Sequence, residues 1–283
     1  MGPTYTATHL KVTMPPLIYG TAWKQARTAA LVTQALRLGF RGIDTACQPK
    51  HYNESGVGEG VAAAFADGLR RDELYLQTKF TTVSGQDPQR IPYDPQARLS
   101  EQVKQSLAMS LKNLRTDYLD CLVLHSPIAD ATSASEVWET MESFVDARQV
   151  RQLGISNCYD PGYLAALHRE VRVKPVVVQN RFYADTDYDQ EIRQFCRENG
   201  IVYQSFWTLS ANPNLLASNE ISALAKSYGR TPAQVLFRYL QQVGVTPLTG
   251  TTSEQHMRDD LAILEFELRA SDVASLTSLV AKA

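Results

Sequence analysis

The sequence lacks the long hydrophobic runs that would place it in a membrane. None of its apolar stretches approaches the roughly 20 residues that a spanning helix needs. The first twenty residues, MGPTYTATHLKVTMPPLIYG, also lack the basic segment followed by an apolar segment that marks a secretory signal. The net charge is only −2, so no global field attracts nucleic acid or anionic lipid. We therefore expect a cytoplasmic protein that has neither a membrane nor a nucleic acid as its partner.

Cysteine is scarce as well. The 283 residues contain four cysteines without a CxxC pair, namely Cys47, Cys121, Cys158 and Cys196. They fall in or beside apolar runs or in a helical pattern, which predicts reduced, mostly buried thiols and no disulfide framework. The five histidines are scattered without metal-ligand spacing, so we expect no metal. The GxSxG and HExxH signatures of hydrolases are also missing.

The sequence does contain a regular alternation of two patterns. Eight short apolar runs that end in small or polar residues predict β-strands. These runs begin at Leu17, Gly42, Leu74, Leu119, Gln152, Pro175, Ile201 and Val245. Longer amphipathic segments between them predict helices over 25–38, 57–69, 97–114, 134–147, 161–169, 190–199 and 231–241. A short helix over 254–261 and a final helix over 271–281 follow the last strand.

The repeat of roughly 30 residues is the size of one strand–helix–strand unit. A doubly wound open sheet also alternates strands and helices. Eight units with nearly continuous apolar strands favour a closed parallel (β/α)8 barrel, the TIM barrel of the α/β class. No Pro-, Gly- or Ser-rich linker divides the chain, so we expect residues 1–283 to form a single domain.

The chemistry of such a barrel collects at the carboxyl ends of its strands. The second, third and fourth predicted strands end near Asp44, Lys79 and His125, and Tyr52 lies in the loop after the second. Each of these residues alone has an ordinary structural explanation, such as a turn, a surface charge or packing. Four titratable types at the same end of consecutive strands predict a shared site, in which Asp44 pairs with Lys79.

A tyrosine with an ordinary pKa of about 10 is a poor proton donor near neutral pH. A nearby lysine favours the phenolate and lowers that pKa, and an adjacent carboxylate holds the lysine charged. The sequence therefore predicts an acid, Tyr52, that protonates an oxygen becoming an alkoxide. His125 would orient the substrate oxygen or share the proton.

Six short segments then follow one another, each at or just after a predicted strand end. They are RGIDTA from Arg41, YNE with VG from Tyr52, QTK from Gln77, LHSP from Leu124, GISN from Gly154 and VQNR from Val178. In this order they resemble the aldo-keto reductase family, and the match extends from about Leu17 to Leu268. The resemblance implies that a small-molecule aldehyde or ketone is reduced with hydride from NADPH, with NADH as the alternative.

The resemblance also implies a role for each matching position. Tyr52 would be the general acid, supported by Lys79 and Asp44, and His125 would bind the substrate carbonyl. Three residues match the positions that hold the nicotinamide carboxamide, namely Ser156, Asn157 and Gln179. Phe206 matches an aromatic ring that stacks on the nicotinamide. The remaining cofactor positions are Gly20, Thr21, Asp44, Trp207, Leu209, Thr249, Gly250, Thr251, Thr252, His256, Arg258 and Asp260. The substrate pocket would consist of Trp23, Tyr52, His125, Ser126 and Trp207.

The sequence departs from the family's pattern in three places. The loop 47–51 before Tyr52 is longer than usual. The Ser-Pro-Leu that commonly follows the stacking aromatic is replaced by 207–209, Trp-Thr-Leu. His256 stands near the usual position of an arginine that binds the adenosine 2′-phosphate, which leaves Arg258 as the only strong cation nearby. Gly250 and the threonines beside it still offer an anion site at the start of the 254–261 helix.

Two other functions stay open at this point. The chain could be a cofactor-binding regulatory subunit without turnover, or a non-redox barrel enzyme such as an isomerase or lyase. The sequence predicts neither the individual substrate nor the oligomeric state. Only about thirty residues follow the last strand, so we expect an open pocket, or one closed by Trp23, Trp207 and the loop 86–96.

Overall fold

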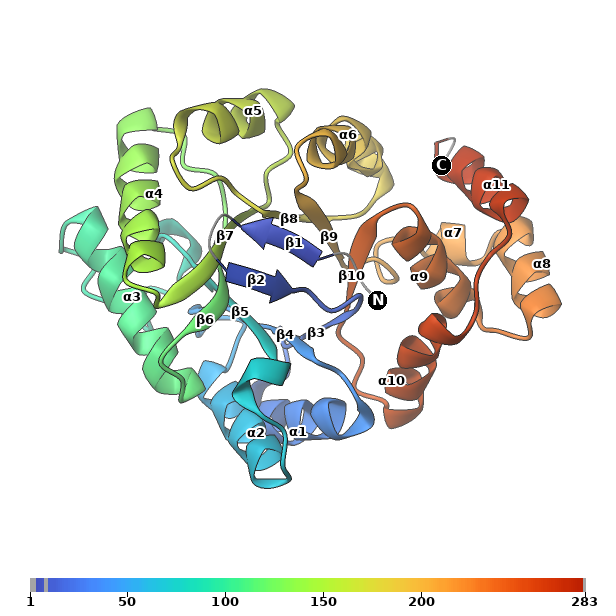
Figure 1. Cartoon of the computed structure of the whole chain (residues 1–283), viewed down its shortest axis with the longest axis horizontal. Helices are drawn as coiled ribbons and strands as arrows, with labels where there is room; N and C mark the ends of the chain where they lie inside the picture. The colour runs from blue at the N-terminus through green and yellow to red at the C-terminus, as the bar shows by residue number, and fades with distance from the viewer. Residues whose placement is uncertain (1–3, 8–9, 282–283) are drawn as a thin grey trace.

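Eight parallel strands form a closed barrel in the computed structural model, which describes residues 4–7 and 10–281 (Figure 1). In chain order they are β3 (Ile18–Gly20), β4 (Gly42–Asp44), β5 (Tyr75–Phe80), β6 (Leu119–Leu124), β7 (Val150–Ser156), β8 (Val177–Arg181), β9 (Val202–Phe206) and β10 (Val245–Thr249). The last strand pairs with the first through Leu248 and Ile18, which closes the sheet and excludes the open-sheet alternative. The predicted TIM barrel and its eight strands are confirmed.

The helices surround the barrel. All nine predicted helices are present, with ends that shift by no more than about three residues, as is usual for helix boundaries. They are α1 (Thr28–Leu38), α2 (Glu54–Ala66), α3 (Leu99–Leu114), α4 (Ala131–Asp146), α5 (Pro161–Glu170), α6 (Gln190–Glu198), α9 (Pro232–Gln242), α10 (Glu254–Leu261) and α11 (Ala270–Val280). Short 3-10 segments cover Gln25–Arg27, Arg71–Glu73, Val83–Gly85, Ala184–Asp189 and Ala262–Glu265.

Two helices between β9 and α9 were not predicted, α7 (Pro213–Leu216) and α8 (Asn219–Tyr228). The sequence does carry start and stop signals for α8. The Ser218 hydroxyl accepts a hydrogen bond from the Ile221 amide at 3.2 Å, and Gly229 ends the helix in the left-handed region at φ 61°. These two residues are the signal that would have located the helix.

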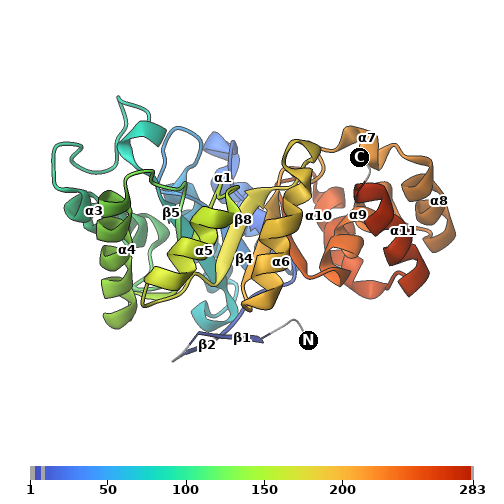
Figure 2. The same cartoon turned by 90° about the horizontal axis from the view of Figure 1, so that it is seen from above.

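An antiparallel hairpin, also unpredicted, precedes the barrel: β1 (Thr4–Ala7) and β2 (Leu10–Thr13). It lies across one end of the barrel, as Figures 1 and 2 show. Val12 and Met14 are buried together with inward-facing strand residues such as Ile18 and Val177. Since this end is covered by the hairpin, the functional cavity opens at the other end, where the strands terminate.

Helix α2 is held close to both of its neighbours by glycine. A Cβ on Gly58 would lie 2.0 Å from the Asn113 carbonyl oxygen of α3, and one on Gly60 would lie 2.7 Å from the Ala29 carbonyl oxygen of α1. These approaches exclude any larger residue. The glycines thus fix the helix that directly follows Tyr52.

The four cysteines are buried and unpaired, as the sequence predicts. None of the helices in the described ranges is both long enough and apolar enough to cross a membrane. The predicted domain of residues 1–283 includes 1–3, 8–9 and 282–283, which lie outside the described residues.

Candidate active site

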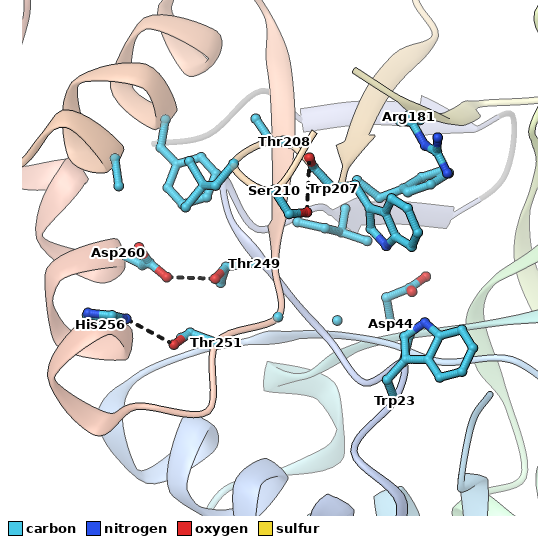
Figure 3. A pocket seen from close by; sticks show the side chains of 18 of the residues that line it. Trp23, Asp44, Arg181, Trp207, Thr208, Ser210, Thr249, Thr251, His256 and Asp260 are labelled. Atoms are coloured by element: carbon cyan, nitrogen blue, oxygen red, sulfur yellow. Dashed lines mark hydrogen bonds between the residues drawn. The ribbon is translucent and has the colours of Figure 1, made fainter. Parts of the chain in front are cut away.

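A cavity of about 1220 Å³ opens at the carboxyl ends of the barrel strands (Figure 3). Most predicted site residues line it, and they come from the ends of seven strands, the loops that follow and helix α10. They are Gly20, Trp23, Asp44, Tyr52, His125, Ser156, Asn157, Gln179, Phe206, Trp207, Leu209, Thr249, Gly250, Thr251, His256 and Asp260. Within the described ranges no three metal-ligating side chains lie together as a metal site would require.

Five predicted residues lie outside this lining. Lys79 is buried below the cavity floor, where it contacts Asp44. Thr21 is fully buried and its hydroxyl donates to the Asp44 carbonyl oxygen at 2.9 Å. Ser126 is exposed and its hydroxyl donates to the neighbouring His125 carbonyl oxygen. Among the residues that the structure describes, neither Thr252 nor Arg258 faces the cavity. Direct substrate or cofactor contact by these five is not supported by their positions.

Lys79 and Asp44 form a buried ion pair. The Lys79 Nζ donates to Asp44 Oδ1 at 2.6 Å and to Oδ2 at 2.7 Å, and also to the Thr45 carbonyl oxygen at 2.9 Å. Both side chains are almost inaccessible, with exposed fractions of 1% and 4%. Burial alone would lower the pKa of Lys79, but the charge of Asp44, its hydrogen bonds and the neighbouring Tyr52 together outweigh burial and raise that pKa. Lys79 is therefore charged at neutral pH.

Tyr52 lies beside this pair. Lys79 Nζ is 5.2 Å from the centre of its ring, and the His125 ring centre is 6.1 Å away. Burial raises the pKa of the Tyr52 hydroxyl above 10, while the charge of Lys79 acts in the opposite direction. The sequence-based prediction of a lowered pKa is therefore wrong in its net direction, because burial outweighs the lysine. Tyr52 is protonated across the physiological range.

His125 also lines the cavity beside Tyr52. Burial and the charge of Lys79 lower the pKa of His125 to about 3. Its Nδ1 lies 2.6 Å from the Thr81 hydroxyl, which fixes the ring orientation. The imidazole is therefore neutral, which suits hydrogen bonding to a carbonyl oxygen better than transferring a proton.

The long loop before Tyr52 folds as a compact turn around Gln48. The His51 and Tyr52 amides both donate to the Gln48 carbonyl oxygen, at 3.1 and 3.0 Å. The Gln48 side chain in turn donates to the Gly85 carbonyl oxygen at 2.7 Å. The extra residues therefore do not displace Tyr52 from the cavity, and its predicted placement stands.

The two residues after Tyr52, Asn53 and Glu54, hold the tyrosine loop in place through hydrogen bonds of their side chains. The Asn53 side chain accepts from the Gly56 amide at 3.0 Å and so caps α2. The buried Glu54 carboxylate accepts from Thr78 at 2.5 Å and from Ser110 at 2.9 Å. Thr78 directly precedes Lys79, so the motif fixes the tyrosine loop relative to the lysine strand.

A network of buried glutamines supports Asp44 and Gln179, and two of its members were not predicted. Gln77 donates to Asp44 at 2.6 Å, and Gln179 donates to Asp44 at 3.0 Å and to Gln204 at 2.9 Å. Gln204 in turn donates to Gln77 at 3.0 Å. Both amide hydrogens of Gln179 are used in this network, which leaves its Oε1 as an acceptor at the cavity wall.

The backbone is strained at two tryptophans of the cavity rim. Trp23 and Trp207 have φ values of 63° and 54°, a region that residues with bulky side chains rarely adopt. Strain of this kind costs about 1–3 kcal/mol per residue and tends to cluster at functional sites. The two tryptophans are exposed, at 57% and 48%, and the Trp23 ring stacks on His51 at 3.9 Å. They form two walls of the opening.

The far end of the cavity is bounded by β10 and α10 (Figure 3). Thr249 donates to the buried Asp260 carboxylate at 2.6 Å, and burial raises the pKa of Asp260 to about 6. His256 lies 3.5 Å from the Thr251 hydroxyl. Arg258 is held by Glu254 at 2.6 Å on the outside of the helix, so it supplies no charge to this end.

The last helix leaves the opening free. Helix α11 packs on α8 and α9, and none of the described residues beyond Asp260 lines the cavity. This agrees with the expectation of an open pocket. Trp23 and Trp207 do stand at its rim, whereas the loop 86–96 contributes no lining residue in the described chain.

Several lining residues were missed by the sequence analysis, among them Lys24, Gln48, His51, Arg181 and Ser210. Lys24 donates to the Gly250 carbonyl oxygen and so bridges the loops after β3 and β10. Gln48 Oε1 and His51 Nδ1 are buried and have no hydrogen-bond partner among the described residues. Most buried polar atoms in native proteins have such a partner. These two atoms at the cavity wall fit a site that binds a polar ligand.

Comparisons with known proteins identify the family of the chain. A profile of the aldo/keto reductase family matches residues 16–281. An aldo-keto reductase of Mycolicibacterium smegmatis is 28% identical over 253 residues, covering 89% of this chain and 84% of that protein. Estradiol 17 beta-dehydrogenase 5 of Mus musculus is 27% identical over 300 residues, covering 94% and 88%.

Solved structures share the fold. An aldo/keto reductase of Brucella melitensis is similar with a TM-score of 0.82 at 24% identity, covering 99% of this chain and 100% of its own. Aldose reductase of Schistosoma japonicum has a TM-score of 0.81 at 22% identity, covering 98% and 92%. Since the family profile spans nearly the whole sequence, the chain belongs to the aldo/keto reductase family, whose members carry out NAD(P)H-dependent carbonyl reduction.

Proposed function

We propose that this protein reduces an aldehyde or ketone to an alcohol, with Tyr52 as the proton donor. The observation that carries the proposal is the arrangement of Tyr52 beside the buried Lys79–Asp44 pair and the neutral His125 at one end of the cavity. NAD(P)H supplies the hydride when it is bound. Tyr52 and His125 stand where negative charge on the substrate oxygen would be stabilised.

The roles of the surrounding residues combine the resemblance to the family with the atoms that the structure leaves free. Gln179 Oε1 would accept from the nicotinamide carboxamide, and Ser156 and Asn157, which are hydrogen-bonded beside it, match the other positions that hold this group. Phe206 would stack on the nicotinamide ring, and Trp207 with Leu209 would cover the pyrophosphate. Trp23 and Trp207 would also bound the substrate pocket. Asp44 would hold Lys79 charged and Gln179 in place.

NADPH is proposed as the cofactor, with NADH accepted at comparable affinity. The resemblance to the family favours NADPH, and the loop around Gly250 offers backbone amides before α10. The side chains at this end fit a 2′-phosphate poorly, because Asp260 is acidic and Arg258 is already paired with Glu254. We expect the KM values for NADPH and NADH to differ by less than about tenfold, or about 1.4 kcal/mol.

Replacing His256 by arginine is expected to lower the KM for NADPH by about tenfold and to leave that for NADH unchanged. A guanidinium on this face of α10 would meet the 2′-phosphate, and charge-assisted hydrogen bonds are worth about 1.5–3 kcal/mol. Initial rates with each cofactor measure the effect, and NADH serves as the internal control. An equal decrease in KM for NADPH and NADH would show that the side chain at position 256 does not contact the 2′-phosphate of the cofactor.

The overall reaction is tested with the purified protein and both cofactors. Fluorescence titration measures cofactor binding, and loss of NADPH absorbance with a panel of aromatic and aliphatic aldehydes and ketones measures turnover. We expect binding and one alcohol formed per cofactor oxidised. Cofactor binding without oxidation by any carbonyl would favour the regulatory subunit, and failure to bind either cofactor would favour a non-redox enzyme.

A further inference from the structure

Arg181 is a cavity-lining cation that the proposed reaction does not use. It is the last residue of β8, two positions after Gln179 on the same face of the strand. Since a strand rises about 3.3 Å per residue, Arg181 begins about 7 Å nearer the opening than Gln179. Gln179 contacts Asp44, so Arg181 stands above the end of the cavity where reduction is proposed.

The guanidinium of Arg181 is held by aromatic faces and has no carboxylate partner. Its central carbon lies 4.2 Å from the centre of the Trp207 ring and 4.9 Å from that of Tyr183. In the described part of the chain it takes part in no ion pair, whereas Arg71, Arg172 and Arg230 all do. Stacking restrains the plane of the guanidinium but leaves its N–H edge available for hydrogen bonds.

The other charges at this end are already balanced. Asp44 neutralises Lys79 by direct contact, and His125 is neutral because burial lowers its pKa to about 3. Lys24 also lines the cavity, but its ammonium donates to the Gly250 carbonyl oxygen in the loop after β10. Arg181 therefore brings a positive charge, without a carboxylate partner among the described residues, to the side of the cavity where reduction is proposed. Figure 3 places Arg181 and Trp207 on the side of Asp44, with His256 and Asp260 on the opposite side of the cavity.

This position separates Arg181 from the proposed adenosine end of the cofactor. A guanidinium with a free edge recognises carboxylate, sulfonate and phosphate groups through paired hydrogen bonds. The cavity opens beside it, between Trp207 and Trp23, so a substrate can bring such a group in from solvent.

We propose that Arg181 binds an anionic group of the substrate, so that the preferred substrates are carbonyl compounds that carry a carboxylate or a similar anion. This inference rests on the proposed reductase function and deepens it by naming the substrate class. Arg181 could bind an oxyanion from either of two sources, namely the carboxylate of the substrate or the pyrophosphate of the cofactor. The experiment below distinguishes the two sources.

The test compares 2-, 3- and 4-carboxybenzaldehyde with their methyl esters in the wild-type protein and in Arg181→Met. Methionine keeps a long apolar chain against Trp207 and removes the charge. For the best-placed isomer we expect the KM of the acid to rise at least about tenfold in the variant, as loss of a charge-assisted hydrogen bond requires. The KM of the matching ester should change less than twofold, and the Kd for NADPH should not change.

Arg230→Met is the matched control, because Arg230 also stacks on an aromatic ring, Phe266, but pairs with Glu265 away from the cavity. It should leave the KM of every substrate unchanged. Equal KM values for acids and esters in the wild-type protein would overturn the proposal. A weaker Kd for NADPH in Arg181→Met, with acids and esters affected alike, would assign Arg181 to the cofactor and also overturn it.

A binding measurement keeps this test independent of turnover. Benzoate and benzamide are titrated against the NADPH-loaded protein while tryptophan fluorescence is recorded, since Trp207 stacks directly on Arg181. We expect benzoate to bind at least about tenfold more tightly than benzamide, and Arg181→Met to abolish the difference. If no aldehyde is reduced, the proposed function fails, and this titration alone decides whether Arg181 binds an anion.

Discussion

Replacing Tyr52 by phenylalanine is expected to lower kcat for carbonyl reduction by about 10²–10⁴-fold, the usual contribution of a positioned acid. The substitution removes one oxygen atom and keeps the ring that packs beside His125. Cofactor affinity should therefore stay within about twofold of the wild type, because no proposed cofactor contact depends on the hydroxyl. Steady-state rates with a reactive aldehyde and fluorescence titration with NADPH measure the two effects.

The pH dependence gives this prediction a second readout. Reduction requires the protonated form of Tyr52, and burial raises its pKa above 10. Deprotonation of Tyr52 should therefore not lower the rate of the wild-type protein near neutral pH, and the rate should fall only as the pH rises through that raised pKa. The residual activity of Tyr52→Phe should lack this alkaline decrease.

Tyr228→Phe is the matched control for loss of a tyrosine hydroxyl. That hydroxyl donates to Asp272 at 2.5 Å and lies outside the cavity, so its removal should leave kcat unchanged. Undiminished reduction by Tyr52→Phe would refute Tyr52 as the proton donor. The aldo/keto reductase membership would stand in that case, because it rests on the whole chain.

The barrel could be predicted because its signal repeats along the chain. Each strand is a short apolar run and each helix a longer amphipathic one, so an error in one unit does not change the architecture. The site residues could be placed for the same reason, since the carboxyl ends of parallel strands meet at one rim. The pairing of Asp44 with Lys79 could be predicted from their positions at the ends of two neighbouring strands.

Features that depend on contacts across the barrel could not be predicted. Gln77 and Gln204 lie inside apolar runs 127 positions apart, and only the closed barrel brings their side chains together. Arg181 belongs to the VQNR motif in the sequence, which does not predict its contact with Trp207. That contact forms because the ends of β8 and β9 are paired. The direction of the Tyr52 pKa shift depends on how deeply the hydroxyl is buried, which residue types alone do not give.

Replacing Lys79 by methionine should affect stability as well as activity. The free energy of unfolding is expected to fall by about 3–5 kcal/mol, because the Asp44 carboxyl group would be left in a buried site without its ion-pair partner. Gln77 and Gln179 would still donate to Asp44 but carry no compensating charge. The activity should fall too, since the positive charge beside Tyr52 that favours release of its proton is lost. Denaturant unfolding and steady-state rates measure the two losses.

The double variant Asp44→Asn with Lys79→Met separates these two effects. Asparagine at position 44 keeps an oxygen that accepts from Gln77 and Gln179, and no uncompensated charge remains in the barrel. Most of the lost stability should therefore return, while reduction should stay as slow as in Lys79→Met because the lysine charge is still missing. A double variant no more stable than the single one would assign the loss to packing around the lysine chain. Recovery of both stability and rate would show that the pair serves only to hold the barrel together.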